Sequence, residues 1–318
     1  MKPKYTEIFN TGDEPGSAPI ITCALPLYRS GKIAWLALES LCRQRSIDFS
    51  WELIVCEEVR QRGVPLSETN PLTLEGLSEY SERLKAVGCS RVLYIPLTSW
   101  IPLSDKWVKM AGFCSESSYG FLLVAGDCYS YPKRLINSKK MFDCGGEWVQ
   151  APVGSFYNIL SGTLSVFDHK LSKESSIPGH RVHPCALNMG IKTSIIKKIE
   201  SGGKERSVDS WMFMQAQTIL GRPPKINMDL SGDWMEGVDT HGYNQISRLR
   251  GGMIGSESRD PEKPFRKPTC REPDSIREIL PESITRRLLS LPRDIPEPEP
   301  LGQDLLRRSH AKRRNRLM

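Results

Sequence analysis

The sequence predicts an α/β fold in which a mostly parallel β-sheet is flanked by helices. Three observations support this fold class. Four short apolar runs in the first half of the chain each end at proline or at acidic residues, as buried parallel strands do. Stretches with helical spacing of apolar residues lie between these runs. The chain has 318 residues, 39% hydrophobic and 25% charged, which is typical of a folded globular protein.

The first predicted strand covers residues 20–25 and stops at Pro26, because proline lacks the N–H that a strand interior needs. Gly31 then precedes a predicted helix over residues 33–42. Its apolar residues recur at helical spacing, so one face of this helix is expected to lie against the sheet.

The second predicted strand covers residues 51–56 and stops at Glu57 and Glu58. Residues 74–87 are predicted to form one helix, since leucine, tyrosine and valine side chains recur on a single face. Gly88 follows directly and is a typical helix stop signal. Strand and helix therefore alternate for a second time.

The third predicted strand covers residues 91–96, and a helix is predicted over residues 104–115. The fourth strand covers residues 120–125 and stops just before Asp127. Four repeats of this alternation predict a parallel sheet with helices on both faces. Ligands of such sheets bind beyond the carboxyl ends of the strands. The polar residues at those ends are therefore the candidates for a site, namely Tyr28, Arg29, Glu57, Glu58 and Asp127.

After Asp127 the alternation is less regular. Residues 156–167 are predicted to add a strand or a hairpin. Residues 186–199 resemble a short strand and turn that lead into a helix, and residues 207–219 are predicted to be helical. Ser207 or Asp209 is expected to cap the last of these helices.

The domain organisation is predicted as a catalytic domain over residues 1–250 and a proline-rich, basic, partly irregular extension over residues 251–318. The whole chain carries a formal net charge of +7, and the extension supplies +4 of it along with nine of the 23 prolines. Dense proline disfavours regular structure, although a short helix is expected near residues 283–291. The cluster of six cations at 307–316 suggests contact with phosphates or an anionic membrane surface, against the alternative of a solvated tail.

Several classes of protein are disfavoured. No apolar run approaches the length of about 20 residues that crosses a bilayer, and the N-terminus has no apolar signal segment. A cytoplasmic location, with peripheral membrane association as an alternative, is expected. Nine cysteines without a Cys-x-x-Cys pattern indicate free thiols. The glycine motifs of dinucleotide oxidoreductases and of P-loop NTPases do not follow any predicted strand.

The order of these pieces resembles the GT-A-fold nucleotide-sugar glycosyltransferases of the broad family 2 type, over about residues 19–248. The likeness depends on the order and spacing of four stretches rather than on any one of them. They are residues 20–29 with the helix that ends at 40–44, residues 51–58, residues 121–135, and Ser207-Val-Asp-Ser-Trp211 together with residues 239–244.

The sequence departs from that family at the end of the fourth strand. Family members have Asp-x-Asp there, followed by a proline and a leucine. Aligning on Pro132 and Leu135 places Asp127 at the second aspartate, which usually contacts the metal, and Ala125 at the first, which usually contacts the ribose. In the alternative register Asp127 is the first aspartate and Tyr129 replaces the second.

The resemblance implies a transfer that a divalent cation assists, because the departing nucleoside diphosphate carries additional negative charge. Asp127 is the candidate carboxylate ligand and His241 the candidate second ligand. Hard oxygen donors suit Mn²⁺ or Mg²⁺, and an imidazole favours Mn²⁺. The alternatives are a turn-capping role for Asp127 and a polar loop role for His241.

An inverting transfer needs a general base that deprotonates the acceptor hydroxyl. Asp209 resembles the late catalytic carboxylate of the family, and a position at the start of a helix would keep it ionised. The alternative for Asp209 is a structural N-cap. Asp233, Glu236 and Asp239 are weaker candidates for the base.

The donor, expected to be a UDP- or GDP-sugar, is assigned six contacts by the same resemblance. Glu57, preferred to Glu58, stands where the family usually has an aspartate and would bind the base or ribose; the alternative is a solvated charge at the strand end. Tyr28 would stack on the base within a loop that Pro26 helps to fix. Lys106 would meet phosphate or base, against the alternative of an exposed helix lysine. Ala125 and Asp127 complete the set.

Other patterns have weaker interpretations. His180, His183 and Cys185 have metal-ligand spacing but no partner cluster, so a loop near the acceptor is preferred to a zinc site. Tryptophans at 148, 211 and 234 are either core residues or platforms for the glycan or other hydroxyl acceptor. Two rival functions stay open: a catalytically impaired module that binds nucleotide or glycan, and a basic-tailed protein that associates with nucleic acid or membranes.

Overall fold

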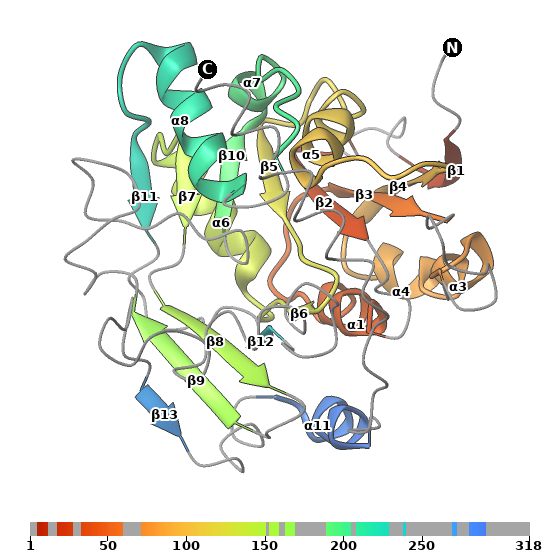
Figure 1. Cartoon of the computed structure of the whole chain (residues 1–318). Coiled ribbons are helices and arrows are strands. Elements are labelled where there is room, and N and C mark those ends of the chain that lie inside the picture. Colours follow the sequence, from red (N-terminus) through yellow and green to blue (C-terminus); the bar gives the residue numbers. More distant parts are fainter. Residues whose placement is uncertain are drawn as a thin grey trace, which may run out of the picture.

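The computed structural model is built around an eight-stranded sheet of order β1-β4-β3-β2-β5-β10-β7-β11 (Figure 1). Strands β2 to β5 are parallel, β7 and β11 run in the same direction, and β1 and β10 are antiparallel to their neighbours. The predicted, mostly parallel sheet is therefore confirmed. The strands are β1 Thr6–Asn10, β2 Ile21–Leu27, β3 Trp51–Glu58, β4 Cys89–Leu97, β5 Gly120–Leu123, β7 Trp148–Gln150, β10 Met189–Lys192 and β11 Ile226–Met228.

The structure describes 5–11, 18–27, 33–59, 71–150, 153–158, 163–168, 189–204, 208–228, 238–239, 269–271 and 280–290. In the short strands within 153–168, 238–239 and 269–271 it describes the backbone alone.

Helices cover both faces of the sheet and enclose two separate cores (Figure 1). Alternate side chains of β3 enter different cores, as the pleat of a strand requires: Leu53 and Val55 on one face, Ile54 and Cys56 on the other. The first face is covered by α1 Trp35–Leu41, α3 Leu74–Ser78, α4 Ser81–Lys85 and α6 Arg134–Asp143. The second is covered by α5 Leu103–Ala111, α7 Thr193–Ile196 and α8 Val208–Leu220.

A second, five-stranded sheet of order β13-β9-β8-β12-β6 lies below the first in Figure 1. Its β8 and β9 are antiparallel, so the predicted hairpin near residues 156–167 is confirmed. Residues from the predicted extension contribute β13 to this sheet and form the helix α11. These elements are β6 Cys128–Tyr129, β8 Val153–Asn158, β9 Thr163–Asp168, β12 Val238–Asp239, β13 Thr269–Arg271 and α11 Glu282–Leu289.

Two strands extend beyond their predicted ends. Strand β2 continues through Pro26, because its pairing with β5 has already ended at Ala24 and the missing N–H breaks no bond on that side. Strand β3 includes Glu57 and Glu58, which pair with Pro96 and Leu97 of β4. The two carboxylates that were expected just beyond the end of β3 therefore belong to residues that are paired with β4 within the sheet.

The single helix predicted over residues 74–87 was wrong, since α3 and α4 are separate. Between them the Tyr80 N–H bonds to the Leu77 carbonyl, three residues back, which tightens the turn and interrupts the helical repeat. Gly88 does end this segment, with φ of +83°. A side chain at Gly88 would also approach the Phe49 carbonyl to 3.0 Å, so both conformation and space favour glycine there.

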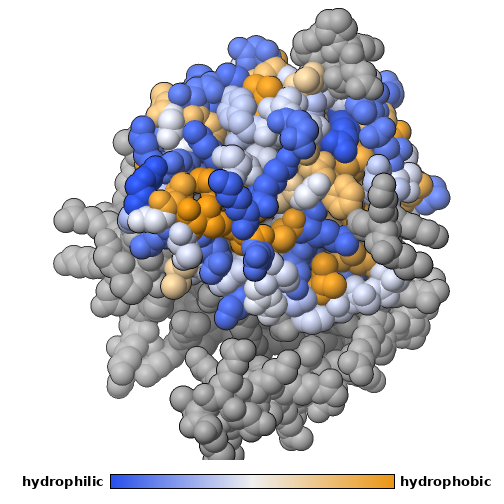
Figure 2. Space-filling model, turned by 90° about the horizontal axis from the view of Figure 1, so that it is seen from above, coloured by the Kyte–Doolittle hydropathy of each residue, from blue (hydrophilic) through white to orange (hydrophobic). Residues whose placement is uncertain are grey.

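The helices on the second face present a mixed surface. Figure 2 looks down on this layer and shows apolar patches interrupted by hydrophilic residues. Seven cysteines have described side chains, and all seven are free. In the part of the chain that the structure covers, no helix is long and apolar enough to cross a membrane.

Candidate active site

The parallel strands end together at one edge of the large sheet. Leu27 of β2 pairs with Glu57 of β3, and Glu58 pairs with Leu97 of β4. Strand β5, which neighbours β2, ends nearby at Leu123. Because these strands are parallel, the connections that leave them collect at this carboxyl edge, where ligands of open α/β sheets bind.

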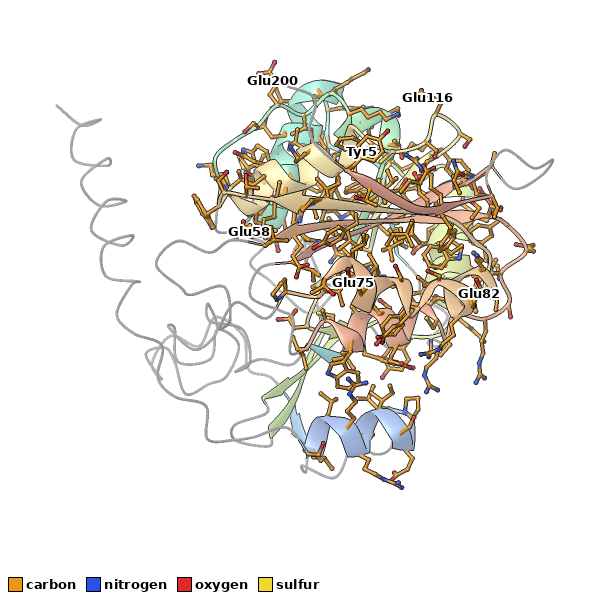
Figure 3. All side chains as sticks on the ribbon, turned by 90° about the vertical axis from the view of Figure 1, so that its right-hand side faces the viewer. Tyr5, Glu58, Glu75, Glu82, Glu116 and Glu200 are labelled. Atoms are coloured by element: carbon orange, nitrogen blue, oxygen red, sulfur yellow. The ribbon has the colours of Figure 1, made fainter. Side chains whose placement is uncertain are left out.

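A buried ion pair crosses the carboxyl edge. Lys106 Nζ lies 2.8 Å from Glu58 Oε1 and donates a hydrogen bond of 2.9 Å to the Leu27 carbonyl. The side chains of Lys106 and Glu58 are 3% and 0% exposed. The same Glu58 oxygen accepts a hydrogen bond from the Ile101 N–H. Lys106 is thus not an exposed helix lysine; it joins the ends of β2 and β3 to α5. Figure 3 shows Glu58 at one end of the strands.

Glu57 points to the opposite face of the sheet. Its Oε1 accepts a hydrogen bond from the Leu72 N–H and its Oε2 accepts one from the Tyr94 hydroxyl, both at 2.8 Å. Burial raises the pKa of the Glu57 carboxyl, and these two donors partly offset the rise. Glu57 therefore fixes the chain that enters α3, and each of its oxygens already accepts one bond.

Asp127 lies in a tight turn between β5 and β6. The Cys128 N–H donates to the Ala125 carbonyl at 3.1 Å, which closes the turn, and the Cys128 thiol donates to Asp127 Oδ1 at 3.6 Å. The Asp127 residue is 9% exposed. Arg134 braces the turn from α6, donating to the Leu123 carbonyl and to Ser130 Oγ.

The end of α1 also supports this turn. Gln44 Nε2 donates to the Tyr131 carbonyl at 2.8 Å, and Gln44 Oε1 accepts from the Leu135 N–H at 3.1 Å. The Arg45 N–H bonds to the Pro132 carbonyl at 2.7 Å. The segment after Asp127 is therefore held by backbone and side-chain bonds to the end of α1.

A late segment of the chain pairs with the strand that comes directly after Asp127. In the β6–β12 ladder, Asp239 is opposite Cys128 and Val238 is opposite Tyr129. This pairing brings together the two parts of the sequence predicted to bind the metal. His241 itself, two residues beyond Asp239, lies outside the described residues.

Asp209 occupies the first turn of α8 and is half-buried, and its Oδ1 accepts a hydrogen bond from the Ser210 N–H. The segment before α8 is fastened to the start of α5. Ser104 and Lys204 exchange two hydrogen bonds, and the Gly203 N–H donates to Asp105 Oδ1. Since α5 starts where β4 ends, this fastening places the approach to Asp209 at the carboxyl edge.

Several predicted residues fall outside the described chain. They are Tyr28, Arg29, His180, His183, Cys185, Asp233, Trp234, Glu236 and His241. All five histidines are among the residues that are not described. Among the side chains that the structure describes, no group of three or more His, Cys, Asp or Glu residues could hold a metal ion. Asp127, a hard-oxygen donor in a fixed turn, is the described residue that suits Mn²⁺ or Mg²⁺.

The sequence analysis did not identify some of the residues at this edge. Gln44 and Arg134 bond to groups on either side of the turn, and no sequence pattern indicates such contacts. Trp148 is fully buried against Phe213 in the core and cannot be a sugar platform. Trp100 is 38% exposed and precedes Ile101, the residue bonded to Glu58. Its place four residues after the end of the third predicted strand is the signal that would have indicated it.

No protein-family model matches the sequence. A search of the curated proteins found no match either.

Solved structures do resemble this chain, and they include GT-A-type glycosyltransferases. S. aureus TarS aligns with a TM-score of 0.48 at 12% identity, covering 74% of this chain and 40% of TarS. TarS 1–349 in complex with UDP-GlcNAc aligns at 0.47 and 12% identity, covering 70% and 58%. Mannosyltransferase PcManGT from Pyrobaculum calidifontis, in complex with GDP-Man and Mn²⁺, aligns at 0.47 and 10% identity, covering 85% and 69%.

The resemblance and the fold class predicted from the sequence are confirmed. The chain spans 40% of the TarS chain, so it matches a part of that protein. The fold class rests on the strand order and the two helical layers of this chain itself.

Proposed function

We propose that this protein is a glycosyltransferase that moves a sugar from a nucleoside-diphosphate sugar to a hydroxyl acceptor with the help of a divalent cation. The pairing of Asp239 with Cys128 is the observation that carries the proposal. It unites the Asp127 turn with the segment leading to His241, at the edge where ligands of such sheets bind.

Asp127 and His241 are the proposed metal ligands. Two residues of extended chain span at most about 7 Å, so His241 is tethered within reach of the residues around Cys128. Bound Mn²⁺ or Mg²⁺ would supply charge stabilisation for the departing diphosphate. Asp127 would provide one ionised oxygen donor, and the donor phosphates would provide others.

The donor-binding residues are proposed to be Pro26, Tyr28, Glu57, Lys106, Ala125 and Asp127. Lys106 would act while paired with Glu58, which holds its ammonium group at the edge. Glu57 would bind through the remaining lone pairs of its oxygens, since each already accepts one hydrogen bond. A role for Ala125 would be through its backbone, because it has no polar side chain.

Asp209 is proposed as the general base of an inverting transfer. It would accept the proton of the acceptor hydroxyl as that oxygen forms its bond to the anomeric carbon. The bond from the anomeric carbon to the diphosphate oxygen breaks in the same step, and the diphosphate leaves with the electron pair. Asp209 supports this role by its place in the first turn of α8, where the helix dipole stabilises an ionised carboxylate.

The test measures donor hydrolysis and transfer with a panel of UDP- and GDP-sugars in the presence of Mn²⁺ or Mg²⁺. Asp127→Asn is expected to reduce turnover at least about 100-fold and to weaken metal binding. Asp209→Asn is expected to keep donor affinity but reduce turnover by about 10²–10⁴-fold. Asp48→Asn, away from the carboxyl edge, is the matched control and should behave as wild type.

Two results would overturn the proposal. Full activity in Asp127→Asn would exclude Asp127 as a metal ligand. A wild-type protein that turns over none of the donors would exclude the transferase function. Clear nucleotide binding without turnover would instead support a binding module, which the alanine at position 125 favours.

A further inference from the structure

The C-terminal helix α11 is packed into the domain through a buried apolar cluster. In the views of Figures 1 and 3 it lies next to α1. The cluster also includes β6, so three elements distant in sequence share one small core. Its members are Ile33, Trp35, Leu36, Tyr129, Leu280, Ile284 and Leu288.

Two polar contacts orient α11 on this cluster. The Arg287 guanidinium lies 4.0 Å from the centroid of the Trp35 ring, a cation–π distance. Arg43 Nη2 donates to Ser283 Oγ at 3.2 Å. Contacts at both ends of the helix restrict its rotation about its own axis.

The surfaces that α11 covers belong to the elements that leave the carboxyl edge. Ile33 and Trp35 begin the segment directly after residues 28–32, which connect β2 to α1. Tyr129 comes two residues after Asp127 and belongs to β6, the strand that pairs with β12. Helix α11 therefore contacts two segments that lead away from predicted site residues, one just beyond the 28–32 connection and one just beyond Asp127.

The Tyr129 side chain contributes through its ring. The residue is 1% exposed, and among the described residues its hydroxyl has no hydrogen-bond partner; burial raises its pKa. The ring belongs to the same buried cluster as Ile284 and Leu288 and lies edge-on to the Tyr131 ring, with the ring centroids 5.9 Å apart. Of the contacts that the structure describes for the Tyr129 side chain, those of its ring are therefore the ones that hold it in place.

We propose that α11 is a positioning helix for the donor and metal site, acting through the Tyr129 ring on the Asp127 turn. This inference rests on the proposed function. When α11 is docked, the Asp127 turn is held in one arrangement. When it is undocked, only a fraction of molecules is competent to bind the donor, and the apparent affinity falls by that fraction.

The main variant is the full-length chain with Ile284→Ala and Leu288→Ala together. If undocking leaves about one molecule in ten competent, KM for the donor rises about tenfold while kcat at saturating donor stays within about twofold. A merely structural helix would instead lower kcat through loss of folded protein and leave KM unchanged. Arg286→Ala is the matched control, because that side chain is 78% exposed on the other face of α11.

Tyr129→Ala tests the proposed contact directly. It should raise KM for the donor as the double variant does, and Tyr129→Phe should restore the wild-type value because the ring is kept. If Tyr129→Phe behaves like Tyr129→Ala, the hydroxyl is what matters and the proposal is overturned.

Amide hydrogen exchange separates this proposal from the proposed function. Exchange in the peptide covering residues 125–131 is followed in the ligand-free wild type, the double variant and Arg286→Ala. We expect about tenfold faster exchange in the double variant alone, whether or not the wild type shows any sugar transfer. Unchanged exchange at 125–131 in a folded double variant would overturn the positioning role, while absent turnover in the wild type would overturn only the proposed function.

Discussion

Lys106→Met is expected to destabilise the domain strongly, because it leaves the Glu58 carboxylate buried without its counter-charge. The Nζ–Oε1 distance is 2.8 Å, and neither side chain is more than 3% exposed. Removing one partner of a buried ion pair costs about 3–5 kcal/mol. A domain of this size changes its Tm by about 2–4 °C per kcal/mol, so the expected fall is about 6–20 °C.

The assay is thermal unfolding followed by circular dichroism, with Lys197→Met as the matched control. Lys197 Nζ lies 3.5 Å from Glu116 Oε1, and the Glu116 side chain is 99% exposed. Surface pairs of this kind contribute about 0–1 kcal/mol, so the control should unfold within a few degrees of wild type. Equal Tm values for the two single variants would refute the buried pair.

The double variant Lys106→Met with Glu58→Leu isolates the cause of the loss. Replacing both charges with apolar side chains removes the stranded carboxylate, and such replacements are often neutral or stabilising. Most of the lost Tm should therefore return. If the double variant is as unstable as Lys106→Met, the loss comes from the bond to the Leu27 carbonyl instead.

Two further predictions concern stability. Burial raises the pKa of Glu57 in the folded state, so the folded state binds its proton more tightly and the free energy of unfolding falls as pH rises through that range. Glu57→Gln should remove this part of the pH dependence and stabilise the protein at neutral pH, since the Tyr94 hydroxyl can accept a hydrogen bond from the new amide. If the free energy of urea unfolding between pH 4 and 8 is the same in the variant as in the wild type, this prediction is wrong. Gly190→Ala should cost about 1–3 kcal/mol, because its Cβ would lie 2.4 Å from Leu122 Cδ2. Gly76→Ala, in a helix where the added Cβ would make only ordinary van der Waals contact, 3.5 Å from Thr73 Oγ1, should gain about 0.5–1 kcal/mol, and chemical denaturation of the two variants should shift in opposite directions.

Apolar patterning predicted the succession of the central strands and helices along the chain. Strands at 51–56 and 91–96 and the helices at 33–42 and 207–219 were all found, because each buries a face that the sequence marks with apolar residues. The short helix expected near residues 283–291 is α11. The break at Tyr80 was not predicted, since it depends on one backbone hydrogen bond and not on the spacing of apolar residues.

Side-chain partners at the carboxyl edge were harder to predict. Glu57 and Glu58 are adjacent and chemically identical, but the pleat sends one to Tyr94 and the other to Lys106. Only the register of β3 decides which of them meets α5. The alternation of side chains between the two faces of a strand is visible in the sequence. Which helix covers each face depends on how the chain connects all the strands of the sheet.

The two described lysines near this edge support a role for a cation in the proposed reaction. Lys106 is the buried positive charge at the end of β2, and its pairing with Glu58 offsets most of that charge. Lys204 lies exposed before α8, where water screens it. Neither lysine can therefore stabilise a leaving diphosphate as a dry, unpaired cation would. In the proposed reaction, a divalent cation at the Asp127 turn would supply charge that these two lysines do not, so we expect metal ions to raise the rate of transfer.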